Sequence, residues 1–404
     1  MLYRIEIDNF FSIGETQIVD LRARKSVEDS LGRLSPIYTG SEERAPNVVA
    51  LFGPNAAGKS NILRAISFVV WFVTRSFENK PNQNLPYEKF GSKEKIGKPT
   101  RLSFTFSGPA NFSGTFGEGP QCPYTYELVL SPRGSRTDSV DLERLSYRPK
   151  GVGKATTIIE RSNGTSVKSA KGFMTASTEN ALNEVLRPQA SVISTLAQLN
   201  HKVAGEFVSS VMAIVSNLFI DRIDNDERDM THWYAANPAA LQRLQEIANR
   251  IDLGIEKIDI DNTMTEPRLL FQHSGLDQII SLHRESHGTR QFIKVFPYIF
   301  MVLERGGIAI IDELDTAIHP LLLPEILRWF GDRTLNPHSA QIWTTCHSVS
   351  LLSELTKEEV IFCEKDSRGY TEVYNLADID KVRRKENFFG NYMGGEYGAV
   401  PVVG

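Results

Sequence analysis

Cysteine is scarce in this sequence: the 404 residues include only Cys122, Cys346 and Cys363. Three widely separated cysteines argue against a disulfide framework and against a zinc cluster, and they fit a reducing compartment. Cys346 stands beside a histidine, but a buried apolar thiol is the more usual role of such a cysteine.

A strong charge of either sign is also lacking, because 45 basic residues face 49 acidic ones and the net charge is −4. No global attraction to nucleic acid or membrane follows, so any such surface would have to be a local patch. The most apolar run, residues 66–73, is far too short to cross a bilayer. The N-terminus has no basic-then-apolar signal pattern. We expect a cytoplasmic protein with no membrane partner.

The periodicity of apolar residues predicts an α/β chain. Two short strands open it, a continuous apolar run at 47–52 indicates a buried strand, and a strongly helical stretch follows. From about 101 to 170, short strand-like runs between turn residues predict an antiparallel β subdomain. Helical periods dominate the next part without sustained heptads, which argues against long coiled-coil arms. Strand candidates at 306–312 and 340–346 alternate with helices in the last part.

The stretch GPNAAGKS at 53–60 matches Gly-x-x-x-x-Gly-Lys-Ser/Thr in full. Gly53 and Gly58 would let backbone N–H groups curl around phosphate oxygens, Lys59 would reach the β and γ phosphates, and Ser60 would ligate Mg²⁺. The strand before the loop and the helix after it are the context that the motif requires. The sequence therefore predicts an ATP and Mg²⁺ site whose nucleotide-binding residues are Gly53, Pro54, Asn55, Ala56, Ala57, Gly58, Lys59, Ser60 and Asn61.

Two later strand ends carry groups suited to the same reaction. IAIIDELD at 308–315 runs from apolar residues into Asp312, a candidate for holding Mg²⁺, and Glu313, a candidate for orienting the attacking water. QIWTTCHS at 341–348 ends its strand with His347. Because ligands bind beyond the carboxyl ends of strands in open α/β sheets, we expect His347 to face the nucleotide and to act with Glu313 in catalysis.

The stretch ESHGTRQF at 285–292 begins a long apolar-rich helix pattern. Ser286 is the residue type that caps the free N–H groups of a helix, and Gly288 leaves the backbone open to close approach. The sequence thus predicts a helix N-terminus with the features of an anion site, about 225 residues after the phosphate loop.

Together these motifs resemble the ABC-type ATPase heads of the SMC/RecF/OLD superfamily, and more narrowly the defence-associated, abortive-infection and RloA-like branch. The resemblance rests on YRIEIDNFFSI, FGPNAAGKSNILRAI, ESHGTRQ, IAIIDELDTAIHP, IWTTCHS and NYMGGEYGAVP. It implies a P-loop ATPase head with a mixed central sheet, an antiparallel β subdomain and a helical signature subdomain. The implied domains are an N-terminal lobe at 1–175, a mainly helical insert ending in the signature loop at 176–290, and a C-terminal lobe at 291–404.

The resemblance also implies an ATP-sandwich homodimer, with a higher oligomer left open, in which the signature loop of one subunit meets the nucleotide of the other. Ser286 and Gly288 correspond to the Ser and second Gly of the signature. His319 falls at the D-loop position, where many relatives have Asp. For the Q-loop glutamine, Gln198 is the first choice and Gln189 the second.

The family implies an ATPase that senses or regulates a separate effector, a nuclease or toxin, in antiphage defence. The 57 residues after His347 are too few for a TOPRIM nuclease domain. The alternatives are a RecF-like DNA-maintenance ATPase that binds DNA ends or junctions, and a scaffold that binds ATP but seldom hydrolyses it. Arg284, Arg290 and the cluster at 381–385 leave a nucleic-acid contact open, although a solvated face is the simpler interpretation.

Overall fold

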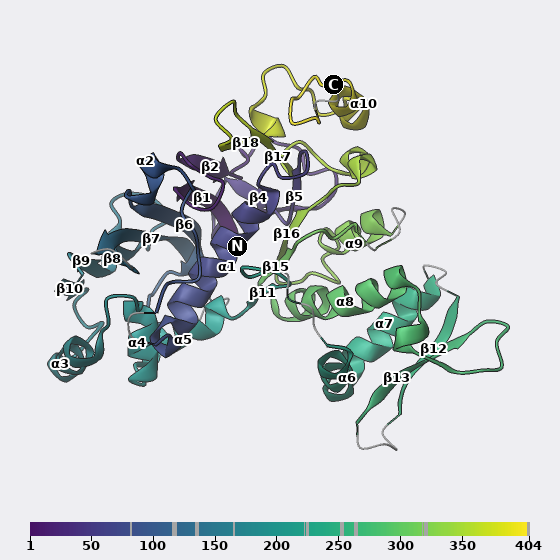
Figure 1. Ribbon diagram of the computed structural model, residues 1–404, viewed down its shortest axis with the longest axis horizontal. Helices are drawn as coiled ribbons and strands as arrows, with labels where there is room; N and C mark the ends of the chain where they lie inside the picture. The colour runs from purple at the N-terminus through teal and green to yellow at the C-terminus, as the bar shows by residue number, and fades with distance from the viewer. Residues whose placement is uncertain are drawn as a thin grey trace.

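The computed structural model describes residues 1–80, 83–114, 119–133, 137–164, 166–221, 223, 226–250, 254–261, 266–316, 318 and 322–401. The chain has the predicted α/β fold with mixed sheets and helices (Figure 1). No helix in the described part of the chain is long and apolar enough to span a membrane.

A six-stranded sheet lies at the centre, with the strand order β11-β15-β16-β5-β17-β18. All neighbouring pairs are parallel except β17 and β18. Every residue of β5, β15 and β16 is buried, as their continuous apolar runs predict. The bounds are β11 Ile214–Ser216, β15 Ile308–Ile311, β16 Gln341–Thr345, β5 Val48–Phe52, β17 Val360–Lys365 and β18 Thr371–Asn375.

A seven-stranded antiparallel sheet forms the second layer, in the order β10-β9-β8-β7-β6-β1-β2. It confirms the antiparallel subdomain and adds the two opening strands to it. The bounds are β10 Ser166–Ser169, β9 Thr156–Ser162, β8 Thr137–Tyr147, β7 Gln121–Arg133, β6 Thr100–Pro109, β1 Leu2–Asp8 and β2 Gln17–Asp20. A small ladder pairs β3, Leu34–Pro36, with β4, Arg44–Pro46.

Helix α1, Lys59–Arg75, begins directly after β5 and lies between the two large sheets (Figure 1). Alternate residues of β5 enter different cores, because successive strand side chains point to opposite faces. Val49 and Leu51 join the core that contains α1 and the antiparallel sheet. Val48, Ala50 and Phe52 join the second core, which also contains residues of α8, His287–Arg305, and α9, Leu323–Trp329. The phosphate loop is thus anchored to both cores.

The predicted helical insert at 176–290 divides between these cores. Its first helices, α3 Ala176–Val185, α4 Val192–Gln198 and α5 Lys202–Val211, pack beside the antiparallel sheet. Its later part packs in the other core and contains a three-stranded sheet (Figure 1). The elements of that part are α6 Glu227–Ala236, α7 Pro238–Arg250, β12 Ile255–Asp261, β13 Arg268–His273 and β14 Ile280–Ser281.

Of the remaining helices, α8, α9 and α10 pack in the second core. The short α2 lies at the end of β1, where Asn9 Nδ2 donates to the Lys95 carbonyl oxygen at 2.8 Å. Helix α8 is the long apolar-rich helix predicted after the Ser-x-Gly stretch, and α9 follows β15 along the chain. Helix α10 lies near the C-terminus (Figure 1). The bounds are α2 Lys93–Ile96, α8 His287–Arg305, α9 Leu323–Trp329 and α10 Phe388–Met393.

Candidate ATP site

The phosphate loop occupies the carboxyl end of β5 and needs both of its glycines. Gly53 has φ 143°, and a Cβ there would lie 2.0 Å from the Cys363 carbonyl oxygen. Gly58 has φ 103°, and its Cβ would lie 2.2 Å from Thr371 Oγ1. Both torsions and both contacts exclude a side chain, so the loop backbone can wrap closely around an anion.

Lys59, at the start of α1, points back into the loop. Its Nζ donates to the carbonyl oxygens of Gly53 at 2.8 Å and of Pro54 at 3.0 Å. Burial lowers the pKa of the Lys59 ammonium, and the nearby carboxylates of Asp312 and Asp315 oppose this shift. The side chain is therefore a buried cation at the place where the motif requires a phosphate ligand.

Ser60 and Asp312 meet as the motif predicts. The Ser60 hydroxyl donates to Asp312 Oδ1 at 2.8 Å, although 252 residues separate them in the sequence. The hydroxyl of Thr345 donates to the same oxygen at 2.8 Å. Asn217 holds the backbone of Asp312 from both sides, at 2.7 Å and 3.2 Å. The Asp312 carboxylate is thus fixed beside the phosphate loop.

These residues fit Mg²⁺. A hydroxyl and a carboxylate oxygen are hard donors, and Mg²⁺ in nucleotide sites takes one or two protein ligands, with substrate phosphates and waters completing its coordination. Among the residues that the structure describes, no group of three or more His, Cys, Asp and Glu is arranged as a metal centre. Ser60 and Asp312 would therefore hold the ion together with the nucleotide.

Glu313 and His347, the two predicted catalytic residues, lie together at the ends of β15 and β16. His347 Nε2 is 4.0 Å from Glu313 Oε1. Glu313 has φ 53°, an unfavourable backbone conformation for a residue with a side chain. Its N–H donates to Thr345 Oγ1 at 2.7 Å. Asp315 Oδ2 accepts the backbone N–H of His347 at 2.5 Å, so both residues are held from the neighbouring strand end.

Ser286 caps α8, as the sequence predicts. Its Oγ accepts the backbone N–H of Thr289 at 3.1 Å, and both Ser286 and His287 are exposed. The preceding Glu285 is buried and lies 2.6 Å from His273 Nε2 at the end of β13. No hydrogen bond or ion pair of the described residues joins Ser286 to the phosphate loop of its own chain.

The structure does not bring Gln198 to the loop. Gln198 is exposed at the end of α4. The start of that helix is tied to the far end of α1, where Ser191 N donates to Ser76 Oγ at 2.8 Å. The 17 residues of α1 separate this contact from the phosphate loop by about 25 Å. Gln189 is mostly buried two residues before Ser191. His319, the D-loop candidate, lies outside the described residues.

Several site residues were missed by sequence reasoning. Ser12 Oγ accepts from Asn61 Nδ2 at 2.6 Å and lies 2.8 Å from Thr371 Oγ1, which donates to the Ala57 carbonyl oxygen at 2.8 Å. Thr345 and Asn217 were also missed. Thr345 carried a usable signal, because it is the last residue of a strand predicted to end at the site. The others depend on contacts between distant segments.

Comparison with known proteins assigns the family. A family model described as "AAA domain, putative AbiEii toxin, Type IV TA system" matches residues 48–353, which include the phosphate loop, Ser286, Asp312, Glu313 and His347. The chain belongs to this family. No curated protein matches the sequence significantly.

Three solved structures of SMC heads are similar to this chain, and the likeness to the first shows its fold. One, described as the SMC head bound to the C-winged helix domain of ScpA, has 13% identity and a TM-score of 0.50, over 93% of this chain and 97% of that one. The SMC head domain from Thermotoga maritima has 14% identity and a TM-score of 0.40, over 93% and 98%. The Pyrococcus furiosus SMC head with an extended coiled coil, bound to the C-terminal domain of ScpA, has 15% identity and a TM-score of 0.43, over 93% and 96%. The chain is an AAA-family ATPase with an SMC-like, ABC-type head fold.

Proposed function

We propose that this chain hydrolyses Mg-ATP in composite sites formed by two copies, and that the ATP state regulates a separate effector protein. Hydrolysis rests on one observation above all: Ser60, Asp312, Thr345 and Glu313 form a continuous hydrogen-bonded series from the phosphate loop to the candidate base. This series supports the proposal because it fixes the Glu313 backbone next to the phosphate loop, from where its carboxylate would reach the γ-phosphate.

Each side chain has a distinct role in this proposal. Lys59 would exchange its two carbonyl partners for phosphate oxygens and neutralise their charge. Mg²⁺, held by Ser60 and Asp312, would supply charge stabilisation at the phosphates. Glu313 would orient the attacking water, and His347 would donate a hydrogen bond to the γ-phosphate. The loop residues from Pro54 to Ala57, together with Asn61, would complete the cradle.

The second copy would contribute Ser286 and Gly288. Ser286 is exposed at the N-terminus of a 19-residue helix, an arrangement that favours an anion. Since no hydrogen bond or ion pair of the described residues joins it to its own phosphate loop, we propose that it binds the γ-phosphate held by a partner subunit. The signature residues would then make turnover depend on dimerisation.

Two variants separate these claims. Glu313→Gln should bind ATP normally and lower phosphate release by roughly 10²- to 10⁴-fold, the usual contribution of a general base. Ser286→Arg should leave ATP binding to the monomer intact and abolish both ATP-driven dimerisation and turnover. Phosphate release by Glu313→Gln that equals the wild-type rate would instead support the ATP-binding scaffold.

The proposed effector role rests on the family description, which refers to a toxin–antitoxin system, and on the resemblance to defence ATPases. A cytoplasmic nuclease or toxin is the partner class that we propose. The RecF-like alternative predicts strong stimulation of purified-protein turnover by DNA. In the 381–385 cluster, Arg384 is already bound to Glu358 and to the Glu28 carbonyl oxygen, which leaves less of the cluster's charge for DNA.

A further inference from the structure

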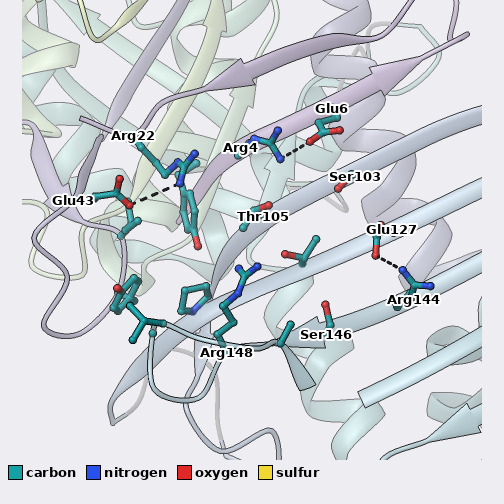
Figure 2. A pocket seen from close by; sticks show the side chains of 18 of the residues that line it. Arg4, Glu6, Arg22, Glu43, Ser103, Thr105, Glu127, Arg144, Ser146 and Arg148 are labelled. Atoms are coloured by element: carbon teal, nitrogen blue, oxygen red, sulfur yellow. Dashed lines mark hydrogen bonds and ion pairs between the residues drawn. The ribbon is translucent and has the colours of Figure 1, made fainter. Parts of the chain in front are cut away.

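A polar cleft of about 810 Å³ lies on the outer face of the antiparallel sheet (Figure 2). The inner-face residues of the same strands, such as Phe104 and Tyr126, are buried in the core with α1. The loops at 37–43 and 148–155 provide further lining. Four arginines and four glutamates line the cleft: Arg4, Arg22, Arg144, Arg148, Glu6, Glu43, Glu127 and Glu160.

Three of the four arginines already have acidic partners. Arg4 pairs with Glu6. Arg22 lies 2.6 Å from Asp20 and 3.8 Å from Glu43. Arg144 lies 3.1 Å from Glu127 and 2.7 Å from Glu160. These pairs leave no net positive charge on the walls of the cleft.

Arg148 is different: its guanidinium makes no ion pair and no side-chain hydrogen bond with any described residue. Figure 2 shows it directed into the cleft, while Arg4, Arg22 and Arg144 lie beside carboxylates. Tyr3 also lines the cleft and is 3% exposed, and its hydroxyl has no hydrogen-bond partner among the described residues. Arg22 and Arg148 both act to lower the pKa of Tyr3 against the larger effect of burial, which raises it. An unpaired guanidinium and a tyrosine hydroxyl without a hydrogen-bond partner therefore line the same cleft.

We propose that this cleft binds a polar peptide segment of a partner protein, with Arg148 pairing to an acidic side chain of that segment. The floor supplies the side chains of Ser103, Thr105, Thr125 and Ser146, which can each donate and accept hydrogen bonds and so match the amides of an extended peptide. The single unpaired cation selects one carboxylate. The proposal rests on the proposed function only in taking a partner protein as the source of the peptide.

Nucleic acid fits this lining less well. Its backbone carries a phosphate at every nucleotide, whereas the ion pairs of the lining leave only Arg148 to attract one of them. Single-stranded nucleic acid also needs aromatic faces for stacking, whereas the aromatic residues of the lining are Tyr3, which is buried, and Tyr38. Pockets for small organic ligands are mostly apolar, unlike this one.

The first strand gives the cleft a direct connection to the ATP site. β1 carries Tyr3, Arg4 and Glu6 to the cleft, and the turn after it carries Ser12, which accepts the hydrogen bond from Asn61 of α1. A peptide bound in the cleft would therefore contact the strand whose following turn supports the phosphate loop.

The test uses full-length protein and pools of labelled peptides of about eight residues, a length typical of extended recognition segments. Seven positions are randomised over Gly, Ser, Thr, Asn and Gln, and a central position is fixed as Glu, Lys or Gln. Retention on immobilised protein is measured without ATP, so that the result does not depend on turnover. A single-stranded oligonucleotide and inorganic phosphate serve as competing probes.

The wild type should retain the Glu pool about tenfold better than the Lys pool, a ratio within the range of one charge-assisted bond. Arg148→Gln should remove this preference, and Arg148→Glu should reverse it toward Lys. The control Arg101→Gln makes the same charge change at an exposed position on β6 outside the cleft, and should behave as the wild type. Melting temperatures establish that each variant is folded.

Equal retention of the three pools, or a Glu preference that survives Arg148→Gln in a folded protein, would overturn the proposal. Arg148-dependent capture of the oligonucleotide or of phosphate in preference to the Glu pool would also overturn it. If turnover proved absent while the Glu pool still bound through Arg148, the ATPase mechanism would fail and the docking cleft would stand.

Discussion

The two halves of the candidate ATP site are built differently. The phosphate loop lies over the centre of the parallel sheet, and its partners Asp312 and Thr345 are buried and hydrogen bonded to one another. The signature end of α8 is exposed, and its main support is the pair of Glu285 with His273. The phosphate-loop half, whose contacts all lie within one chain, should bind nucleotide without a partner. The signature half, which ends in exposed donors, would act only on a nucleotide held by another subunit.

The largest effect on ATP binding should come from a substitution in the phosphate-loop half of the site. Lys59→Ala removes the buried cation of the loop, and we expect ATP affinity to fall by roughly 10- to 100-fold, because a hydrogen bond to a charged group contributes about 1.5–3 kcal/mol. Calorimetry with a non-hydrolysable ATP analogue measures this. Lys168→Ala is the control, since Lys168 is exposed on β10 at the edge of the other sheet. Unchanged ATP affinity in Lys59→Ala would contradict the assignment of residues 53–60 as the nucleotide-binding loop.

A smaller effect should follow from loosening Glu313 without removing it. Thr345→Val keeps the volume but leaves the Glu313 N–H and Asp312 Oδ1 without their shared hydroxyl. We expect turnover to fall about tenfold while the KM for ATP changes little, because the lost bond positions the base. Thr345→Ser keeps the hydroxyl and should restore most of the rate. An equal loss of turnover in both variants would mean that the packing of Thr345, and not its hydroxyl, positions Glu313.

The smallest effect on turnover should come from weakening the contact that supports the exposed signature end of α8. Glu285→Gln weakens the contact with His273 and should lower turnover by about threefold, since the bond contributes on the order of 0.5–1.5 kcal/mol to holding the helix start. ATP binding by the monomer should not change, because the pair makes no contact with the phosphate loop. A fall in monomer affinity would contradict the separation of the two halves.

The features that were predicted correctly are those that depend on a few consecutive residues. The glycines of the phosphate loop, the acidic end of β15 and the cap at Ser286 each follow from a short stretch of chain, and the structure has all three as expected. Contacts across the fold could not be read in the same way. Thr345 reaches Asp312 only because β15 and β16 are neighbours, and Asn217 does so because β11 pairs with β15.

The predicted insert shows the same limit. Its periodicity indicated helices correctly, but no local pattern could show that α4 packs at the far end of α1, because that placement depends on contacts such as Ser191 with Ser76. The family pattern alone therefore could not show that Gln198 lies away from the phosphate loop. A residue that takes part through tertiary position alone has no signal in a single sequence.

Mixing two inactive variants tests the composite site most directly. Lys59→Ala lacks a working phosphate loop, and Ser286→Ala lacks the signature hydroxyl, so each alone should turn over slowly. In a symmetric dimer their mixture contains one intact composite site per heterodimer, and random pairing predicts about a quarter of the wild-type rate. Recovery to that level is the result we predict. A mixture that releases phosphate no faster than the average of the two separate variants would contradict a site shared between subunits.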